Sequence, residues 1–325
     1  MTTPSVDDLL STAHVVSLPL VTRFRGVEHR EAVLVEGPEG WTEFSPFLEY
    51  DDAEAAVWLA AAIDYGWQRQ PEPVRDRVPV NATVPAVAAA DVPALLARFD
   101  GCRTAKVKVA ERGQTLADDV ARVRAVRAAM GPEGRVRVDA NGGWNVDEAE
   151  HAAHALAGFD LEYLEQPCAS VAELAELRER LADWDLPIAA DESVRKAAAP
   201  LDVARRGAAD LLVVKAQPLG GVARALSIVA DAGLPAVVSS ALDTSIGLAM
   251  GVTLAAALPE LPYDCGLGTA SLLAADVTRA PLRPVDGSLP LGRVTPDAAL
   301  LARHAASPDR RTWWLERLER CAALI

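Results

Sequence analysis

The fold is decided by five short apolar segments: TAKVKVA at residues 104–110, VRVDANG at 136–142, LEYLEQP at 161–167, IAADES at 188–193 and LLVVKA at 211–216. Each segment carries a charged residue near its C-terminal end, and these charges recur at intervals of about 24 to 31 residues. A strand, a loop and a covering helix together take roughly 30 residues, so the spacing is typical of consecutive βαβ units. The five segments are therefore predicted to be parallel neighbours in one sheet, with their charges at its C-terminal edge.

The same alternation of strand and helix extends on both sides of this region. Further strands are predicted at residues 78–84 (VPVNATV), 235–240 (PAVVSS) and 263–268 (YDCGLG). Eight strands in this order favour a closed barrel over a doubly wound open sheet. The fold class expected is therefore α/β, a (β/α)7β barrel of the TIM type that occupies residues 78–280.

The N-terminal residues follow a different pattern, which predicts a capping domain over residues 1–77. Two strands are expected at 14–24 and 30–36, followed by a helix that Gly66 would end. The tail, residues 281–325, leaves the alternation of strand and helix and ends in an amphipathic segment. We expect this tail to pack back against the N-terminal residues and to complete an α+β capping domain.

Composition limits the classes of partner. The chain has 32 Lys and Arg against 46 Asp and Glu, and its net charge of −14 argues against binding nucleic acid or anionic lipid through a general field. Residues 1–8 carry acids where a signal peptide needs bases, and no apolar run reaches the roughly 18 residues of a membrane span. The cysteines are scattered, without the spacing of zinc ligands, which predicts reduced thiols. We therefore expect a cytoplasmic protein that binds neither nucleic acid nor membrane.

Three acids, Asp139, Glu165 and Asp191, are expected at the tips of successive strands. Three carboxylates that converge to about 4 Å repel one another by roughly 4 kcal/mol per pair at an effective dielectric of 20, so a cation is expected among them. Oxygen ligands without His or Cys favour a hard divalent ion, which predicts Mg²⁺, with Mn²⁺ as a substitute. The alternative is that each acid caps the helix that follows it, which is common for one acid but not for three in succession.

Lys106 and Lys108 are two residues apart, so on a strand both side chains point to the same face. The alternating Ala105 and Val107 suit the face covered by helices, which leaves both lysines directed to the barrel interior. Buried lysines are costly, and this indicates a catalytic rather than a structural role. Lys215 ends a strand roughly across the barrel mouth, so a bound substrate would have a lysine on either side.

With Lys-x-Lys on the second strand, acids on the next three and Lys on the sixth, the chain resembles the muconate-lactonising-enzyme-like subgroup of the enolase superfamily. Within that superfamily it is similar to the o-succinylbenzoate synthase family, and the resemblance covers nearly the whole chain. The motifs that carry it are FRGV at 24–27, GWTEFSP at 40–46, VRVDANG at 136–142, VSS at 238–240 and GLGT at 266–269.

The resemblance implies a Mg²⁺-dependent hydro-lyase of menaquinone biosynthesis. Its small carboxylate substrate would be 2-succinyl-6-hydroxy-2,4-cyclohexadiene-1-carboxylate, dehydrated to o-succinylbenzoate through an enediolate. Lys108 would remove the proton α to the carboxylate and then protonate the departing hydroxyl, Lys215 would stabilise the intermediate as a cation, and Lys106 would tune Lys108. The implied metal ligands are Asp139, Glu165 and Asp191, and the implied substrate contacts are Asn141, Ser239 and Gly266.

Other interpretations stay open at this point. N-acylamino acid racemases resemble the same pattern and would use both lysines as opposed acid and base. A noncatalytic metal-binding barrel is disfavoured because the set of charged residues is complete. Dipeptide epimerases carry Asp-x-Asp at the eighth strand, where this chain has Asp264-Cys-Gly266. Mandelate-racemase-type members use a His after the sixth strand, but this chain has none between His154 and His304. The oligomeric state is left open.

Overall fold

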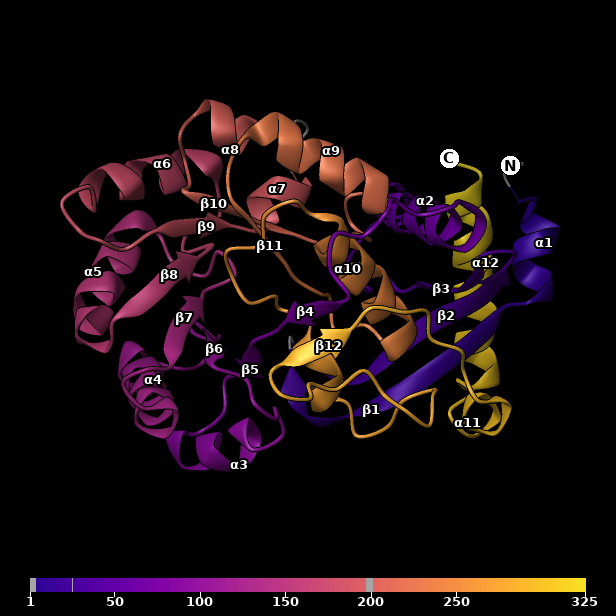
Figure 1. Cartoon of the computed structure of the whole chain (residues 1–325), viewed down its shortest axis with the longest axis horizontal. Helices are drawn as coiled ribbons and strands as arrows, with labels where there is room; N and C mark the ends of the chain where they lie inside the picture. The colour runs from indigo at the N-terminus through magenta and orange to yellow at the C-terminus, as the bar shows by residue number, and fades with distance from the viewer. Residues whose placement is uncertain (1–3, 25, 197–200) are drawn as a thin grey trace.

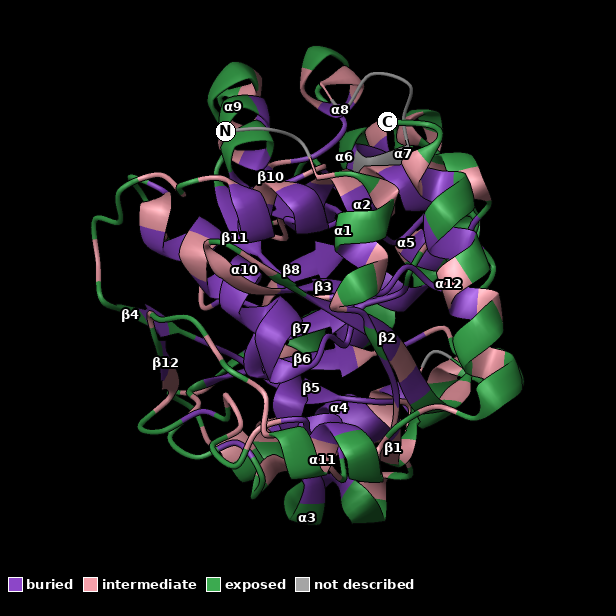
Figure 2. Ribbon diagram, turned by 90° about the vertical axis from the view of Figure 1, so that its right-hand side faces the viewer, coloured by how far each residue is buried: buried purple, intermediate pink, exposed green. Residues whose placement is uncertain are grey.

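The computed structural model describes residues 4–24, 26–196 and 201–325, so Arg25 of the 24–27 motif lies outside the described residues. Figure 1 shows two parts side by side: a curled parallel sheet ringed by helices, and an antiparallel sheet covered by helices from both ends of the chain. Figure 2 shows that the strands of the parallel sheet are buried, whereas the surrounding helices turn exposed faces outward.

A seven-stranded sheet forms the barrel, in the order β5-β6-β7-β8-β9-β10-β11. Every neighbouring pair is parallel and the strand order follows the chain, as consecutive βαβ units produce. This confirms the predicted α/β barrel class. The strands are β5 (Ala82–Val84), β6 (Thr104–Lys108), β7 (Arg135–Asp139), β8 (Leu161–Glu165), β9 (Ile188–Ala190), β10 (Leu211–Val214) and β11 (Ala236–Val238).

Helices cover the outside of this sheet (Figure 1). Val123 and Val126 of α4 are buried in one core with Ala105 and Val107 of β6, so the apolar face of that strand turns outward to its helix as predicted. The helical elements around the barrel are η1 (Ala89–Asp91), α3 (Val92–Leu96), α4 (Leu116–Met130), α5 (Val146–Leu156), η2 (Ala157–Phe159), α6 (Val171–Arg180), α7 (Glu192–Lys196), α8 (Asp202–Arg205), α9 (Val222–Ala232), α10 (Ser245–Ala257) and η3 (Gly268–Leu272).

The predicted first barrel strand, residues 78–84, is divided in two. β4 (Arg77–Pro79) pairs antiparallel with β12 (Ser288–Pro290) of the tail, and β5 begins after it in the barrel. Pro79 has no amide hydrogen to donate to a ladder, which favours the end of a strand at this point.

The predicted eighth strand, residues 263–268, does not form a continuous ladder. The 3₁₀ turn η3 begins at Gly268, which leaves few residues for pairing. The segment joins the two edges of the sheet through isolated parallel bridges, Val80 with Cys265 and Ser239 with Gly266. The barrel is therefore closed at its eighth position by single contacts rather than by a paired strand.

The capping domain is a three-stranded antiparallel sheet, β1-β2-β3, with helices packed on it (Figure 1). The predicted strand at 14–24 has those bounds, and the second predicted strand is longer, Val27–Gly37. The tail returns as predicted, because Trp314 and Leu318 of its last helix are buried in one core with Trp58. The elements are α1 (Val6–Ser11), β1 (His14–Phe24), β2 (Val27–Gly37), β3 (Gly40–Phe44), α2 (Asp52–Trp67), α11 (Ala298–Arg303) and α12 (Pro308–Ala322).

Gly66 does not end α2 as predicted, because the helix continues to Trp67. The glycine lies where the helix approaches the sheet: a Cβ on Gly37 would lie only 2.3 Å from the carbonyl oxygen of Gly66. The amide of Glu39 donates a hydrogen bond of 2.9 Å to the same oxygen. The two glycines thus permit close packing between helix and sheet.

The four cysteines all lie in the described residues, and each is a free thiol, as predicted. Three of them are buried, where they pack as small apolar side chains. In the part of the chain that the structure describes, no helix combines the length and the apolar character needed to cross a bilayer.

Candidate active site

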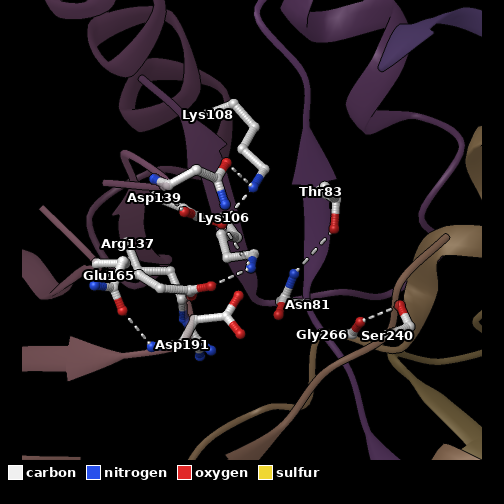
Figure 3. Close-up of polar contacts among 12 residues, drawn as sticks. Asn81, Thr83, Lys106, Lys108, Arg137, Asp139, Glu165, Asp191, Ser240 and Gly266 are labelled. Carbon is white, nitrogen blue, oxygen red and sulfur yellow. Dashed lines mark hydrogen bonds and ion pairs between the residues drawn. The ribbon is translucent and has the colours of Figure 1, made fainter. Parts of the chain in front are cut away.

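The charged residues singled out in the sequence meet at the C-terminal ends of successive barrel strands (Figure 3). Lys106 and Lys108 lie on β6, and Asp139 and Glu165 are the last residues of β7 and β8. Lys108 is the register partner of Asp139, which is in turn the partner of Glu165, so the pairing of the strands brings these side chains together. Two further charged residues directly follow β9 and β10: Asp191 and Lys215.

Lysine ammonium groups stand among the carboxylates. Lys106 Nζ lies 3.0 Å from Oδ2 of Asp139 and 2.7 Å from Oε1 of Glu165. Figure 3 labels these three residues side by side. Lys108 Nζ donates a hydrogen bond to the same oxygen of Asp139. The two lysines therefore share one carboxylate, and Lys106 bridges two strands.

A second ion pair, Lys215 with Asp191, lies at the same mouth. The six charged side chains in the two groups are no more than 11% exposed. Because little water screens charges at this depth, each interacts strongly with its neighbours.

Burial and neighbouring charge move the pKa values of these groups in different directions. Burial raises the pKa of Glu165, and the charge of Asp139 raises it further, to about 8. Burial acts on Asp139 in the same way, but the ammonium groups of Lys106 and Lys108 outweigh it and hold the pKa of Asp139 well below its usual range. With the lysines as the nearby cations, Asp139 is therefore ionised at neutral pH, whereas Glu165 tends to keep its proton.

The acids fit a hard divalent cation by their donor atoms. Oε2 of Glu165 is buried without a hydrogen-bond partner, which leaves an oxygen available to a metal. The structure does not gather three acidic, His or Cys side chains around one metal position within the described ranges. The Lys106 ammonium group lies between Asp139 and Glu165 and contacts both. The oxygen donors of Asp139, Glu165 and Asp191 are of the type that Mg²⁺ prefers.

The charges line a cavity at the mouth of the barrel. All nine predicted site residues except Glu165 line it, and Glu165 contacts Lys106 beside the lining. The other lining residues come from the capping domain, Phe24 and Phe47, and from the barrel, Thr83, Glu192, Ser240, Ala241, Leu242 and Thr269.

The predicted substrate contacts, Asn141, Ser239 and Gly266, all reach this cavity. Asn141 has a left-handed backbone (φ 48°), and its Oδ1 accepts a hydrogen bond of 2.6 Å from Lys108 Nζ. A Cβ on Gly266 would lie 2.5 Å from Oγ of Ser239. A side chain at position 266 would therefore displace the Ser239 side chain at the contact that closes the barrel beside the cavity.

Comparison with known proteins identifies the family. The model "Enolase N-terminal domain-like" matches residues 15–66, and "Enolase C-terminal domain-like" matches residues 89–297. The chain is 57% identical to the o-succinylbenzoate synthase of Mycobacterium marinum over 322 residues, which cover 99% of this chain and 96% of that protein. It is also 57% identical to the o-succinylbenzoate synthase of Mycolicibacterium smegmatis over 323 residues, 99% of this chain and 98% of that one. The chain belongs to the o-succinylbenzoate synthase family.

Solved structures share the fold of this o-succinylbenzoate synthase family member. Muconate lactonizing enzyme from Pseudomonas putida is 21% identical with a TM-score of 0.72, and the match covers 90% of this chain and 98% of that chain. Muconate lactonizing enzyme from Pseudomonas fluorescens, complexed with muconolactone, is 22% identical with a TM-score of 0.74, and the match covers 91% and 98%. Because the sequence identity is low in both cases, these matches concern the fold alone.

Sequence reasoning missed several residues that line the cavity of this family member. Phe24 and Phe47 enter from the capping domain, and the Phe24 ring centroid lies 5.6 Å from Lys108 Nζ. Ser240 and Thr269 come from the barrel, with their hydroxyl oxygens 2.8 Å apart. Each lies in or directly after a motif that carried the resemblance, and no other pattern in the sequence singled it out. The places of Phe24 and Phe47 in the cavity depend on how the capping domain packs against the barrel.

Gln166 is a further missed residue, and it positions the site. Its Oε1 accepts hydrogen bonds from the amides of Asp191 (2.9 Å) and Ser193 (3.1 Å), and its Nε2 donates to Oγ of Ser193 (2.7 Å). The side chain is buried and the backbone is left-handed (φ 37°). Because Gln166 directly follows Glu165, these bonds fix the end of one acid-bearing strand relative to the next.

Proposed function

We propose that the protein catalyses the o-succinylbenzoate synthase reaction, the dehydration of 2-succinyl-6-hydroxy-2,4-cyclohexadiene-1-carboxylate to o-succinylbenzoate in menaquinone biosynthesis. The observation that carries this proposal is 57% identity to o-succinylbenzoate synthases over 99% of the chain. The cavity supports it, because Lys108, Lys215 and the predicted substrate contacts line the same space.

Lys108 is assigned both proton transfers. Dehydration removes a proton from the ring carbon that bears the carboxylate and a hydroxyl group from the neighbouring carbon. As a neutral amine, Lys108 accepts the proton, and it then donates the proton to the departing hydroxyl, which leaves as water. The position of its Nζ supports this role, because it reaches the cavity beside Asn141 and the Phe24 ring.

Lys215 is proposed to stay a cation and to stabilise the negative charge that develops on the substrate. Lys108 lies on β6 and Lys215 follows β10, so a molecule in the cavity has a lysine on either side. The ammonium group of Lys215 forms an ion pair with Asp191. Lys106 is proposed to tune Lys108 through Asp139, the carboxylate that they share.

Asp139, Glu165 and Asp191 are proposed to hold Mg²⁺, with Mn²⁺ as a substitute. When bound, the ion supplies an electrophile that stabilises negative charge on the substrate carboxylate. The set of oxygen donors and the unpartnered Oε2 of Glu165 support this assignment. The chain contributes by keeping the three carboxyl groups on adjacent strand ends and by excluding bulk water from them.

The substrate contacts, the cellular location and the division into domains are proposed as well. Asn141, Ser239 and Gly266 would contact the carboxylates or the succinyl chain of the substrate, which their place in the cavity lining supports. The cytoplasm is the proposed location, supported by four free thiols. The proposed division is capping domain 1–77, barrel 78–280 and tail 281–325.

A second candidate activity is racemisation of N-acylamino acids. The placement of Lys108 and Lys215 on different strands around one cavity favours it, because racemisation requires an acid and a base on opposite faces of one carbon. This activity would use the same lysines and the same metal ligands with a different substrate.

Turnover of two substrates by the purified protein tests both activities. The cyclohexadiene substrate and an N-succinyl amino acid are each assayed with Mg²⁺ and with a chelator. Metal-dependent aromatisation is the expected result. Racemisation without aromatisation would replace the proposed substrate, and the absence of both activities with Mg²⁺ present would overturn the proposal.

A further inference from the structure

Glu43 of the capping domain lies fully buried against the N-terminal end of a barrel helix, α10. Its Oε2 accepts hydrogen bonds from the amide of Thr244 (3.1 Å), the hydroxyl of Thr244 (2.6 Å) and the amide of Gly247 (3.1 Å). Its Oε1 accepts a hydrogen bond of 2.6 Å from the hydroxyl of Ser45. A carboxyl group from one part of the molecule therefore satisfies amides at the end of a helix in the other part.

Gly247 makes room for this contact. A Cβ at position 247 would lie 2.7 Å from Cδ of Glu43, which is closer than side-chain atoms approach. Glycine inside a helix is unfavourable compared with alanine. The close approach of Glu43 gives a physical reason for glycine at this position.

Arg30 of the capping domain holds the loop that precedes α10. Its Nε donates a hydrogen bond of 3.2 Å to the carbonyl oxygen of Leu242, and its Nη2 donates to Oγ of Ser45 at 3.1 Å. Leu242 has a left-handed backbone (φ 63°), a conformation that a leucine adopts only when its surroundings impose it. Glu43 and Arg30 thus contact the same short loop at two points.

This loop is also a wall of the active-site cavity. Ser239, Ser240, Ala241 and Leu242 all line the cavity, and the hydroxyl of Ser240 donates to the carbonyl oxygen of Gly266 at 2.8 Å. The segment follows β11, whereas the lysines and acids of the site belong to β6 through β10 and the residues that follow them. A displacement of the loop would therefore change the shape of the cavity without moving the charged residues directly.

We propose that Glu43 is a positioning residue that sets the pose of the cavity wall at residues 239–242 through its bonds to Thr244 and Gly247, and thereby contributes to substrate binding. Arg30 supports the same wall from the carbonyl of Leu242. This inference rests on the proposed function, because the bound molecule is taken to be the substrate of that reaction.

Steady-state kinetics of three variants give the first test. Glu43→Leu removes the acceptor oxygens and is expected to raise KM about tenfold with kcat within about threefold of the parent, because lost bonds to a buried carboxyl group weaken the wall. Glu43→Gln keeps an acceptor for the helix amides and is expected to restore KM to within about threefold. Glu31→Leu is the matched control, since Glu31 is a capping-domain carboxyl group that binds Arg310 and Trp314 instead of the wall.

Double-mutant cycles separate the wall from the rest of the site. Glu43→Leu is expected to be non-additive in kcat/KM with Ser240→Ala, which lies in the wall, and additive with Asn141→Ala, which follows β7. Equal coupling to both residues, or an unchanged KM in Glu43→Leu, would overturn the proposal.

Hydrogen exchange gives a readout that does not depend on activity. Peptides that span residues 239–247 are expected to exchange faster in Glu43→Leu than in the parent, and to be unchanged in Glu31→Leu. If Glu43→Leu does not fold, Gly247→Ala is used instead. This variant keeps Glu43, but the added methyl group pushes its carboxyl group away from the helix. Unchanged exchange would contradict the proposal even in an active enzyme, whereas an inactive parent with the expected exchange pattern would contradict only the proposed function.

Discussion

Lys106 and Lys108 donate to the same oxygen of Asp139, yet their pKa values move in opposite directions. Burial lowers the pKa of both lysines. Lys106 also donates to Glu165, and the two carboxyl groups outweigh burial and raise its pKa. For Lys108, burial and the charge of Lys106 prevail over Asp139, so its pKa falls. One strand therefore carries a firmly held cation and, two residues further on, an amine that releases its proton more readily.

Replacing Lys108 or Lys215, which lie on two sides of the cavity, is expected to abolish dehydration. Lys108→Ala removes the proposed base, and Lys215→Ala removes the proposed stabilising cation, so each variant should lose at least about 1000-fold in kcat. Initial rates of aromatisation measure the loss, and near-UV circular dichroism checks that the fold is intact. Substantial turnover by a folded variant would overturn the role assigned to that lysine.

Removing a metal ligand is expected to weaken metal binding, and this effect can be measured without an activity assay. Glu165→Gln replaces a buried carboxyl group by a neutral amide and should lower Mn²⁺ affinity at least about tenfold in calorimetric titrations. The control is Glu162→Gln, on the same strand, where the carboxyl group pairs with Arg137 rather than with Lys106. A chelator should abolish aromatisation, and added Mg²⁺ should restore it. Equal Mn²⁺ affinity in the parent and Glu165→Gln would rule out this ligand.

The stability of the protein is expected to depend on pH through Glu43. Burial raises the pKa of this carboxyl group to about 7, and the charge of Asp243 adds to the shift while Arg30 opposes it. An unfolded glutamate has a pKa near 4.3, so the folded state binds more protons between these values and stability falls as the pH rises to about 7.

Glu43→Gln should remove this dependence, because glutamine does not titrate. Relative to the parent, its free energy of unfolding should rise by about 2 kcal/mol between pH 5 and pH 8. Urea denaturation at each pH measures the difference. Asp243 is buried beside Glu43 and has a raised pKa as well, so Asp243→Asn is compared in parallel. A difference between the parent and Glu43→Gln that does not change with pH would contradict the prediction.

The returning tail is expected to stabilise the capping domain through Trp314. Its side chain is fully buried, its ring packs edge-on against Phe44 with centroids 6.0 Å apart, and its Nε1 donates to Glu31 at 2.8 Å. Trp314→Ala should lower the free energy of unfolding by about 3 to 5 kcal/mol in urea denaturation. Trp313→Ala is the control, because that neighbouring side chain is only partly buried and should cost less. Equal losses in both variants would show that burial of Trp314 is not the cause.

Features that depend on local periodicity could be predicted from the amino-acid sequence. Lys106 and Lys108 could be directed to the barrel interior because alternate residues of a strand share a face. The even spacing of charged strand ends predicted that Asp139, Glu165 and Asp191 would lie on neighbouring strands, because parallel strands linked by helices end at one edge of the sheet. The tail helix was predicted from its apolar face. Each of these inferences uses residues close together in the chain or a repeat of known length.

The meeting of distant segments, by contrast, emerged from the packing of the two parts. Glu43 contacts Thr244 across 201 residues of sequence, and Phe24 of the capping domain reaches Lys108 of the barrel. Gly66 was predicted to end a helix, but in the structure the helix continues past it and Gly66 packs closely against Gly37. The Lys106 ammonium group also lies between Asp139 and Glu165, and the sequence pattern did not predict this contact. No local pattern specifies such pairs, because they depend on how two separately patterned parts pack and on which buried groups then lose their contact with water.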